Sequence, residues 1–168
     1  MSGVNDLNAR FSKYVHEILV DAGWFEGREV SLNSIKLPIE YSLFPKAEVV
    51  LVEFGGLRIG EQRRGINFGA DNITIQPFDG ARNAPDFAKY EPVVQSKLYA
   101  VGYIGGRHCS VLIDEEGRVY YSNGYLIRRA CNFDSALELI LMGVRTDSKE
   151  LAAGWGAGAE LEIHLDNS

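Results

Sequence analysis

The sequence predicts an α+β protein in which a mainly antiparallel sheet packs against about three helices. Between residues 98 and 130, short apolar runs alternate with turn residues, which is typical of an antiparallel meander. Outside this block, apolar residues recur at helical spacing over about 6–22, 45–54 and 133–142. These two patterns together define the expected fold class.

Each expected helix has residues at its ends that favour helix initiation or termination. Polar side chains cap the first turn, proline suits the first helical position, and glycine is common just past the last turn. The initiating residues are Asn5 or Asp6, Pro45 and Asn132, and the terminating residues are Gly23, Gly55, Gly56 and Gly143.

Four apolar runs form the expected meander, namely Leu98–Ile104, Cys109–Ile113, Arg118–Tyr121 and Tyr125–Arg129. Asp114-Glu115-Glu116-Gly117 separates the second and third runs, and Gly117 can take the positive φ of a bulged hairpin loop. Asn123-Gly124 separates the third and fourth runs, which is the strongest short-range hairpin signal. Shorter runs at 57–59, 66–68 and 73–75 predict further short strands.

Several segments are less regular. Pro38 interrupts residues 30–42, and three prolines within 77–97 indicate a long surface excursion. We expect one domain over 1–150, followed by a glycine-rich tail, 151–168. Alternation of polar and apolar residues over 160–165 predicts an extra strand, which either folds back on its own sheet or joins two subunits.

The composition limits the classes of partner. The chain has 168 residues and a formal net charge of −6, which argues against direct nucleic-acid binding and suits a basic partner. It contains no apolar run of the about 20 residues that span a bilayer, and residues 1–10 lack the apolar centre of a signal peptide. We therefore expect a cytoplasmic protein that does not bind membranes.

Candidate catalytic groupings do not fit known chemistry. His108 and Cys109 are neighbours on an expected strand and would point to opposite faces, and Cys131 lies at no zinc-ligand spacing from Cys109. The spacing of Gly55 and Gly60 resembles a phosphate loop, but Glu61 occupies the lysine position. We predict no catalytic residue, no cofactor and no metal.

Three signatures in order resemble a known family. They are Ala22-Gly23-Trp24-Phe25-Glu26-Gly27-Arg28, then Val52-Glu53-Phe54-Gly55-Gly56-Leu57, then residues 112–120 with 133–138 and Gly143. Over about 7–143 the chain is similar to the third subfamily of the SUKH superfamily of bacterial immunity proteins. The resemblance implies an α+β fold and protection of the producing cell from a toxin encoded beside it. It also implies that this toxin is a nuclease or a nucleic-acid deaminase.

Within these signatures, eight residues have a structural interpretation. Glycine suits sharp turns, large aromatic residues anchor helices to a sheet, and arginine can pair with a carboxylate or with helix-end carbonyls. The structural residues are Gly23, Gly27, Gly55, Gly56 and Gly117, Trp24 and Phe54, and Arg28.

The expected contacts with the toxin lie at the hairpin tip and beside it. Carboxylates would complement the basic cleft of a nuclease, and aromatic side chains would hold the complex. The candidates are Asp114, Glu115, Glu116, Tyr120, Tyr121 and Tyr125. The 77–97 segment and the acidic tail, which match nothing in the family, are candidates for partner-specific recognition.

Other functions are compatible with the same sequence. The chain could be a regulatory or scaffold protein of this fold without a toxin partner. It could also bind a small molecule between the sheet and the second helix, or, as the last alternative, be an enzyme without a familiar motif. We expect a monomer or a weak homodimer.

Overall fold

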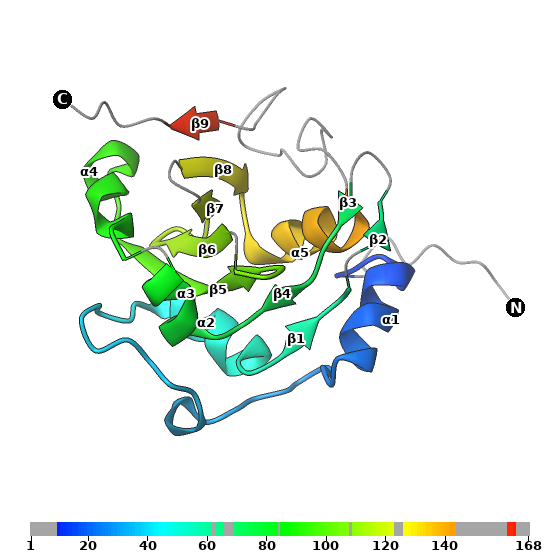
Figure 1. Ribbon diagram of the computed structural model, residues 1–168. Helices are drawn as coiled ribbons and strands as arrows, with labels where there is room; N and C mark the ends of the chain where they lie inside the picture. The colour runs from blue at the N-terminus through cyan, green and yellow to red at the C-terminus, as the bar shows by residue number, and fades with distance from the viewer. Residues whose placement is uncertain are drawn as a thin grey trace, which may run out of the picture.

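The computed structural model describes residues 10–61, 63–65, 69–83, 85–107, 109–122, 126–143 and 161–163. Its centre is a seven-stranded sheet with the strand order β1-β4-β5-β6-β7-β8-β9, and every neighbouring pair is antiparallel. Helices cover this sheet (Figure 1). The α+β fold class that the sequence predicts is confirmed.

The expected meander corresponds to four consecutive strands of this sheet. They are β5 Leu98–Ile104, β6 Cys109–Asp114, β7 Val119–Ser122 and β8 Leu126–Ala130. The short strands β1 Arg58–Ile59 and β4 Ile73–Thr74 lie where short apolar runs predict them, whereas the run 66–68 lies outside the described residues. A separate small sheet pairs β2 Arg63–Arg64 with β3 Gly69–Ala70.

The edge of the main sheet next to β8 is formed by a segment of the tail. Here β9, Leu161–Ile163, pairs antiparallel with β8, with Arg128 opposite Leu161. The strand therefore lies on the sheet of its own chain (Figure 1). The turn at Asn123-Gly124 lies outside the described residues.

The first helix is shorter than the sequence predicts. Helix α1 spans Lys13–Asp21, and its cap is Ser12, whose hydroxyl accepts a hydrogen bond from the Val15 N–H at 3.3 Å. The expectation that the helix begins near residue 6, capped by Asn5 or Asp6, is therefore wrong. The apolar period continues upstream of Ser12, but a capping hydroxyl ends helical pairing at its own position.

The other two expected helices have the expected bounds. Helix α2 spans Pro45–Phe54 with proline at its first position, and α5 spans Phe133–Met142. The Asn132 side chain accepts a hydrogen bond from the Ser135 N–H at 2.8 Å. Gly143 ends α5 in the left-handed conformation, with φ of 62°.

The 77–97 segment is not a surface excursion. It forms α3 Pro77–Asn83, the 3₁₀ turn η2 Phe87–Tyr90 and α4 Glu91–Val94, and it covers one face of the sheet. Phe87 and Tyr90 are buried there in a cluster with alternate strand residues, namely Leu98, Ala100, Leu112, Tyr120 and Leu126. Two of the three prolines that suggested a loop, Pro77 and Pro92, instead lie in the first turn of short helices, and Pro85 lies in the turn before η2.

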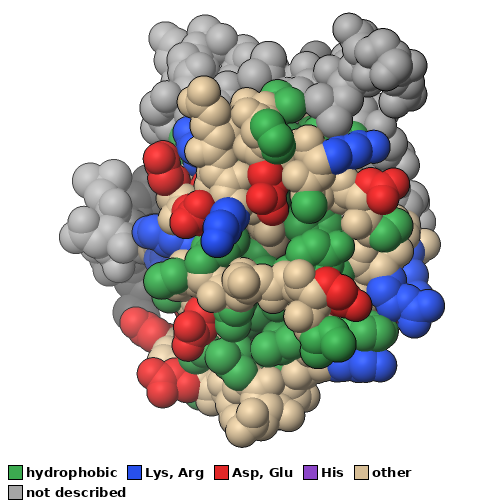
Figure 2. Space-filling view, turned by 90° about the vertical axis from the view of Figure 1, so that its left-hand side faces the viewer, with side chains coloured by type: hydrophobic (Ala, Val, Ile, Leu, Met, Phe, Trp, Pro, Cys, Tyr) green, Lys and Arg blue, Asp and Glu red, His purple; other side chains and the backbone are tan. Residues whose placement is uncertain are grey.

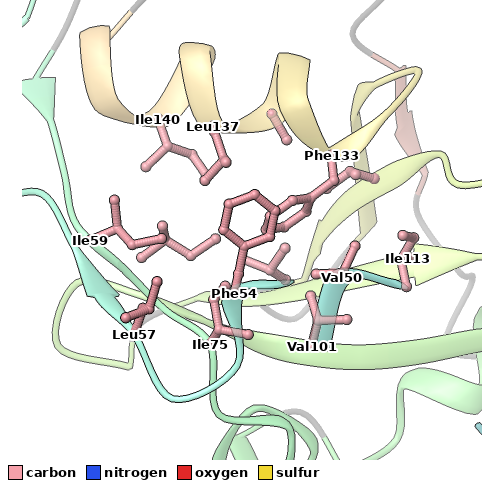
Figure 3. Close-up of a cluster of buried hydrophobic side chains, with 14 of the residues drawn as sticks. Val50, Phe54, Leu57, Ile59, Ile75, Val101, Ile113, Phe133, Leu137 and Ile140 are labelled. Carbon is pink, nitrogen blue, oxygen red and sulfur yellow. The ribbon is translucent and has the colours of Figure 1, made fainter. Parts of the chain in front are cut away.

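The opposite face of the sheet holds the larger core. Here α1, α2 and α5 pack against the strand residues whose side chains point to this face. They include Tyr99, Val101, Val111, Ile113 and Val119. Figure 3 shows Phe54 of α2 at the centre of this core, beside Phe133 of α5. Because β5 and β6 are covered on both faces, they are almost continuously buried, which explains their unbroken apolar sequence.

The segment that connects α1 to α2 lies against α2 and forms no strand among its described residues. Its only regular element among the described residues is the 3₁₀ turn η1, Leu32–Ser34. The Val30 N–H donates to the Val52 carbonyl of α2 at 2.8 Å. This segment, residues 30–44, borders the surface described next.

Candidate functional site

The hairpin between β6 and β7 is held together by the carboxylate of Asp114. Its Oδ1 accepts hydrogen bonds from the N–H groups of Glu116 and Arg118, each at 2.9 Å. Its Oδ2 accepts from Arg118 Nε at 2.7 Å and from the Tyr120 hydroxyl at 2.8 Å. Asp114 is 0% exposed and Tyr120 is 1% exposed.

These two residues are therefore not available to a partner protein. Their burial corrects the expectation that Asp114 and Tyr120 contact the toxin. The carboxylate accepts its hydrogen bonds from within the hairpin, and the ring lies in the core beside α4. Burial alone would lower the pKa of Arg118, but its hydrogen bond and charge interaction with Asp114 leave that pKa raised. The buried carboxylate thus has a partner of opposite charge.

Glu115 and Glu116 form the exposed tip of the same hairpin. Glu115 connects the tip to the turn before β5, because its N–H donates to Ser96 Oγ at 3.0 Å and its carboxylate accepts from the Lys97 N–H at 3.1 Å. Glu91 of α4 lies on the other side of this turn, where its carboxylate accepts from the Leu98 N–H at 3.4 Å. The tip and α4 therefore form one continuous surface.

The remaining two candidate tyrosines do not extend this tip. Tyr121 is half-buried and packs against the larger core, on the opposite face of β7 from Tyr120. Tyr125 lies outside the described residues. Of the predicted contacts, Glu115 and Glu116 are the exposed ones among the described residues.

A different tyrosine, Tyr41, lies next to α4. Its ring packs on Phe87 with the ring centroids 4.5 Å apart, and its hydroxyl donates to the Pro85 carbonyl at 3.1 Å. The pKa of Tyr41 is raised, first by burial and then by the negative charges of Glu40, Asp86 and Glu91. An aromatic ring is thus fixed in place with three carboxyl groups around it.

Exposed aliphatic residues complete this surface. Ile39 is 94% exposed, and Val93 of α4 is 43% exposed. Figure 2 views the side of the molecule where α4 and the segment before α2 lie in Figure 1, and it shows hydrophobic side chains gathered near acidic ones. We call this surface the Tyr41 face, comprising Ile39, Glu40, Tyr41, Asp86, Glu91, Val93, Glu115 and Glu116.

The Tyr41 face is apolar at its centre and mostly acidic around it. Its five carboxylates adjoin two lysines, Lys89 and Lys97, and the Lys89 ammonium lies 5.3 Å from the centroid of the Tyr90 ring. The sequence interpretation missed Ile39 and Tyr41. A usable signal was present, because two large apolar residues follow Pro38 in a segment with no strand or helix period to bury them.

The signature residues occupy structural positions. The guanidinium of Arg28 donates to the carbonyls of Glu53 and Gly55, the latter at 3.0 Å, so it caps the C-terminal end of α2. Burial lowers the pKa of Arg28. Trp24 and Phe54 are buried in the larger core.

The signature glycines also have backbone reasons. Gly23, Gly27, Gly56 and Gly117 have positive φ, and at Gly117 this allows the tight hairpin above Asp114. A Cβ atom on Gly55 would lie 2.2 Å from Ile35 Cδ1 and 2.4 Å from the Leu51 carbonyl oxygen. Gly55 is therefore required by close packing and not by its φ.

The described part of the chain shows neither a metal-binding cluster nor a membrane-spanning helix. No group of three or more His, Cys, Asp or Glu side chains there is arranged to hold a metal ion. None of the helices described is long and apolar enough to cross a membrane.

One family model, described as SUKH-3 immunity protein, matches residues 11–143 of the chain. No curated protein and no solved structure matches. The matched span contains the three signatures and every residue of the Tyr41 face. The chain therefore belongs to the SUKH-3 immunity protein family.

Proposed function

We propose that this chain protects the cell that makes it by binding one cognate toxin and occluding the active site of that toxin. Membership in an immunity protein family supports the protective role. The observation that carries the mode of action is the Tyr41 face, where an immobilised aromatic ring and exposed aliphatic residues lie among carboxylates. In this proposal the chain acts by binding and does not catalyse a reaction.

The charge of the Tyr41 face suits a toxin that acts on nucleic acid. A nuclease or nucleic-acid deaminase needs a basic cleft, because its substrate carries one phosphate charge per nucleotide. Carboxylates that face such a cleft accelerate association and discriminate against acidic partners. The same charge disfavours direct binding of nucleic acid by the chain itself, and we propose that the toxin is its partner in the cytoplasm.

The centre of the face supplies features found at tight interfaces. Aromatic side chains in well-packed positions carry much of the binding energy at protein interfaces, and apolar neighbours exclude water from them. Tyr41 is already held by Phe87 and by its hydrogen bond to Pro85. Its immobilisation lowers the entropy lost on binding, because the side chain is ordered before the partner arrives.

A small-molecule site between the sheet and α2 finds little support. Val50 and Phe54 of α2 fill that interface, together with Ile75, Val101 and Ile113 from the sheet and its edges (Figure 3). The hollows described in this structure instead open on the outer surface. We propose that the chain acts as a monomer or a weak homodimer.

The test is rescue followed by inhibition. The chain is co-expressed with the toxin encoded by the neighbouring gene, and the purified pair is assayed for toxin activity and complex formation. We expect survival and stoichiometric inhibition. Failure of the wild-type chain to bind the toxin would contradict the proposal, and so would turnover of a substrate by the purified chain that one polar substitution abolishes.

A further inference from the structure

A concave surface outside the Tyr41 face lies on the outer side of α2. It is a groove of about 450 Å³ between residues 27–29 and the solvent-facing residues of the helix. We call it the α2 groove; it is lined by residues 27–29, Pro45, Glu48, Val49, Val52 and Glu53. None of these residues belongs to the Tyr41 face.

The α2 groove is apolar at its centre. Val49 is 65% exposed, and Val52, one turn further along the helix, is half-buried. The core-facing stripe of α2 consists of Ala47, Val50, Leu51 and Phe54, so Val49 contributes nothing to that core. A β-branched residue is also a poor choice for an exposed helix position, where Lys or Glu would form a better helix.

The rim of the groove carries unpaired negative charge. Glu29 and Glu48 are exposed, and within the described part of the chain neither side chain forms an ion pair or a hydrogen bond. Glu53 is paired with Arg10. Arg28 also lines the groove, but its guanidinium donates to backbone carbonyls and forms no ion pair with Glu29 or Glu48.

The groove adjoins the hairpin tip that borders the Tyr41 face. A Cβ atom on Gly117 would lie 3.5 Å from Lys46 Cδ, so the first turn of α2 touches the β6–β7 hairpin. On its other side, the hairpin contacts Ser96 and Lys97 through Glu115. One partner that covers the tip can therefore reach both surfaces.

We infer that the α2 groove binds a segment of the cognate toxin in which an aliphatic side chain lies next to a lysine or arginine. The aliphatic group would cover Val49 and Val52, and the cation would lie between Glu29 and Glu48. This rests on the proposed function and adds a second contact to it. A second copy of the chain is a poorer occupant, because its own net charge of −6 opposes approach to this rim.

Paired substitutions separate the two parts of the inference. Val49→Lys replaces the apolar centre with a cation, which also repels the cation of the partner. Because lysine is a better helix former than valine, this substitution should not destabilise α2. Glu29→Gln with Glu48→Gln removes the charge and keeps the shape. Val20→Lys and Glu17→Gln are matched controls on α1, where Val20 is 48% exposed and Glu17 is exposed.

Affinity for the purified toxin is measured by titration calorimetry, after thermal unfolding has shown that each variant is folded. We expect both groove variants to bind at least about tenfold more weakly, and both controls to bind within about twofold of the wild type. The Gln pair should also reduce the salt dependence of the association rate.

The outcomes distinguish this inference from the proposed function. If the wild-type chain does not bind the toxin, the proposed function fails and the inference fails with it. If the wild-type chain binds and both groove variants bind equally well, only the inference is wrong. A groove substitution that changes the oligomeric state by sedimentation, with unchanged toxin affinity, would assign the groove to a second copy and overturn the inference.

Discussion

Tyr120 donates its hydroxyl hydrogen bond to Asp114 at 2.8 Å, and both side chains are excluded from solvent. The two residues lie on neighbouring strands of one hairpin, and the ring of Tyr120 belongs to the smaller core beneath α4. The carboxylate therefore links the chain reversal at the hairpin tip to the packing of the 77–97 segment on the sheet. A residue that resembles a solvated turn acid in the sequence is a structural centre in the fold.

Asp114→Asn is expected to destabilise the protein by about 2–4 kcal/mol, because it leaves buried donors without an acceptor and removes the buried counter-ion of Arg118. The other carboxylate near Arg118, that of Glu116, is exposed and lies 3.5 Å away. The amide nitrogen would face either the Arg118 Nε–H and Tyr120 hydroxyl or the two backbone N–H groups. Equilibrium denaturation in urea measures the loss. Glu116→Gln is the control, because it removes only the exposed ion pair of Glu116 with Arg118, and it should cost less than about 0.5 kcal/mol.

Arg10 joins three helices and should tolerate lysine poorly. Arg10 lies just before α1 begins. Its guanidinium donates hydrogen bonds to Glu53 of α2 and to Asp134 of α5, the latter from Nε at 2.6 Å and from Nη2 at 2.9 Å. These hydrogen bonds hold the pKa of Arg10 above its usual range. Lysine cannot reproduce a planar fork between two carboxylates, so Arg10→Lys should lower stability by about 1 kcal/mol.

The Arg10 effect is checked by denaturation at low and at high salt. Salt should reduce the difference between wild type and Arg10→Lys, since the side chain of Arg10 is half exposed and screening applies to it. Arg107→Lys is the matched control, because Arg107 and Asp79 are 3.7 Å apart in an exposed single pair. An equal loss in both variants would contradict a special role for Arg10.

The close approach of α3 to β5 depends on two glycines. A Cβ atom on Gly80 would lie 2.5 Å from the Gly102 carbonyl oxygen, and Ser110 Oγ donates to the Gly80 carbonyl at 2.8 Å. Gly80→Ala should therefore push α3 away from the sheet and cost about 2–3 kcal/mol. Gly106→Ala is the control, because a Cβ atom there would meet nothing within 4 Å. Circular-dichroism melting of the two variants gives the comparison.

The regular elements of the larger core could be predicted because their signals are local. Pro45, Asn132 and Gly143 mark helix ends within one turn, and the four meander strands carry continuous apolar runs. The 77–97 segment could not be predicted in this way. Its helices are too short for an apolar period, and they are positioned by contacts such as Gly80 with Gly102, which are distant in sequence.

The candidate site shows the same limit. Glu115 and Glu116 could be placed at an exposed tip from the turn signal alone. Asp114 could not be recognised as buried, because its partners Arg118 and Tyr120 become neighbours only through the register of β6 and β7. The apolar residues after Pro38 signalled that Ile39 and Tyr41 belong to no regular element, but the sequence carries no signal for the contact of residues 39–41 with residues 85–93 that forms the Tyr41 face.

Burial of Tyr99 predicts a loss of stability at alkaline pH. Burial raises the pKa of Tyr99 to about 12, above the usual value of 10. Between these two pH values the folded chain keeps the phenolic proton that the unfolded chain has lost, so stability falls as pH rises. The loss should approach about 2 kcal/mol by pH 12. Tyr99→Phe should remove this part of the slope, which urea denaturation between pH 9 and about 12 measures.

The Tyr41 face predicts a loss of toxin affinity without a loss of stability. Ile39 is almost fully exposed, so Ile39→Asp should leave thermal unfolding unchanged. Bound to the toxin, the same aspartate would be buried against an apolar surface, and we expect affinity to fall at least about tenfold. Val20→Asp on α1 is the matched control for an exposed aliphatic residue.

Tyr41→Phe separates the contribution of the hydroxyl group from that of the ring. The ring keeps its packing on Phe87, while the hydrogen bond to Pro85 is lost. If the ring anchors the toxin, Tyr41→Phe should retain most of the affinity and Tyr41→Leu should not, because leucine lacks the flat apolar face that interfaces exploit. Equal affinity of Ile39→Asp, Tyr41→Leu and the wild type would exclude this face as the contact, because changes to its central side chains would then leave toxin binding unaffected.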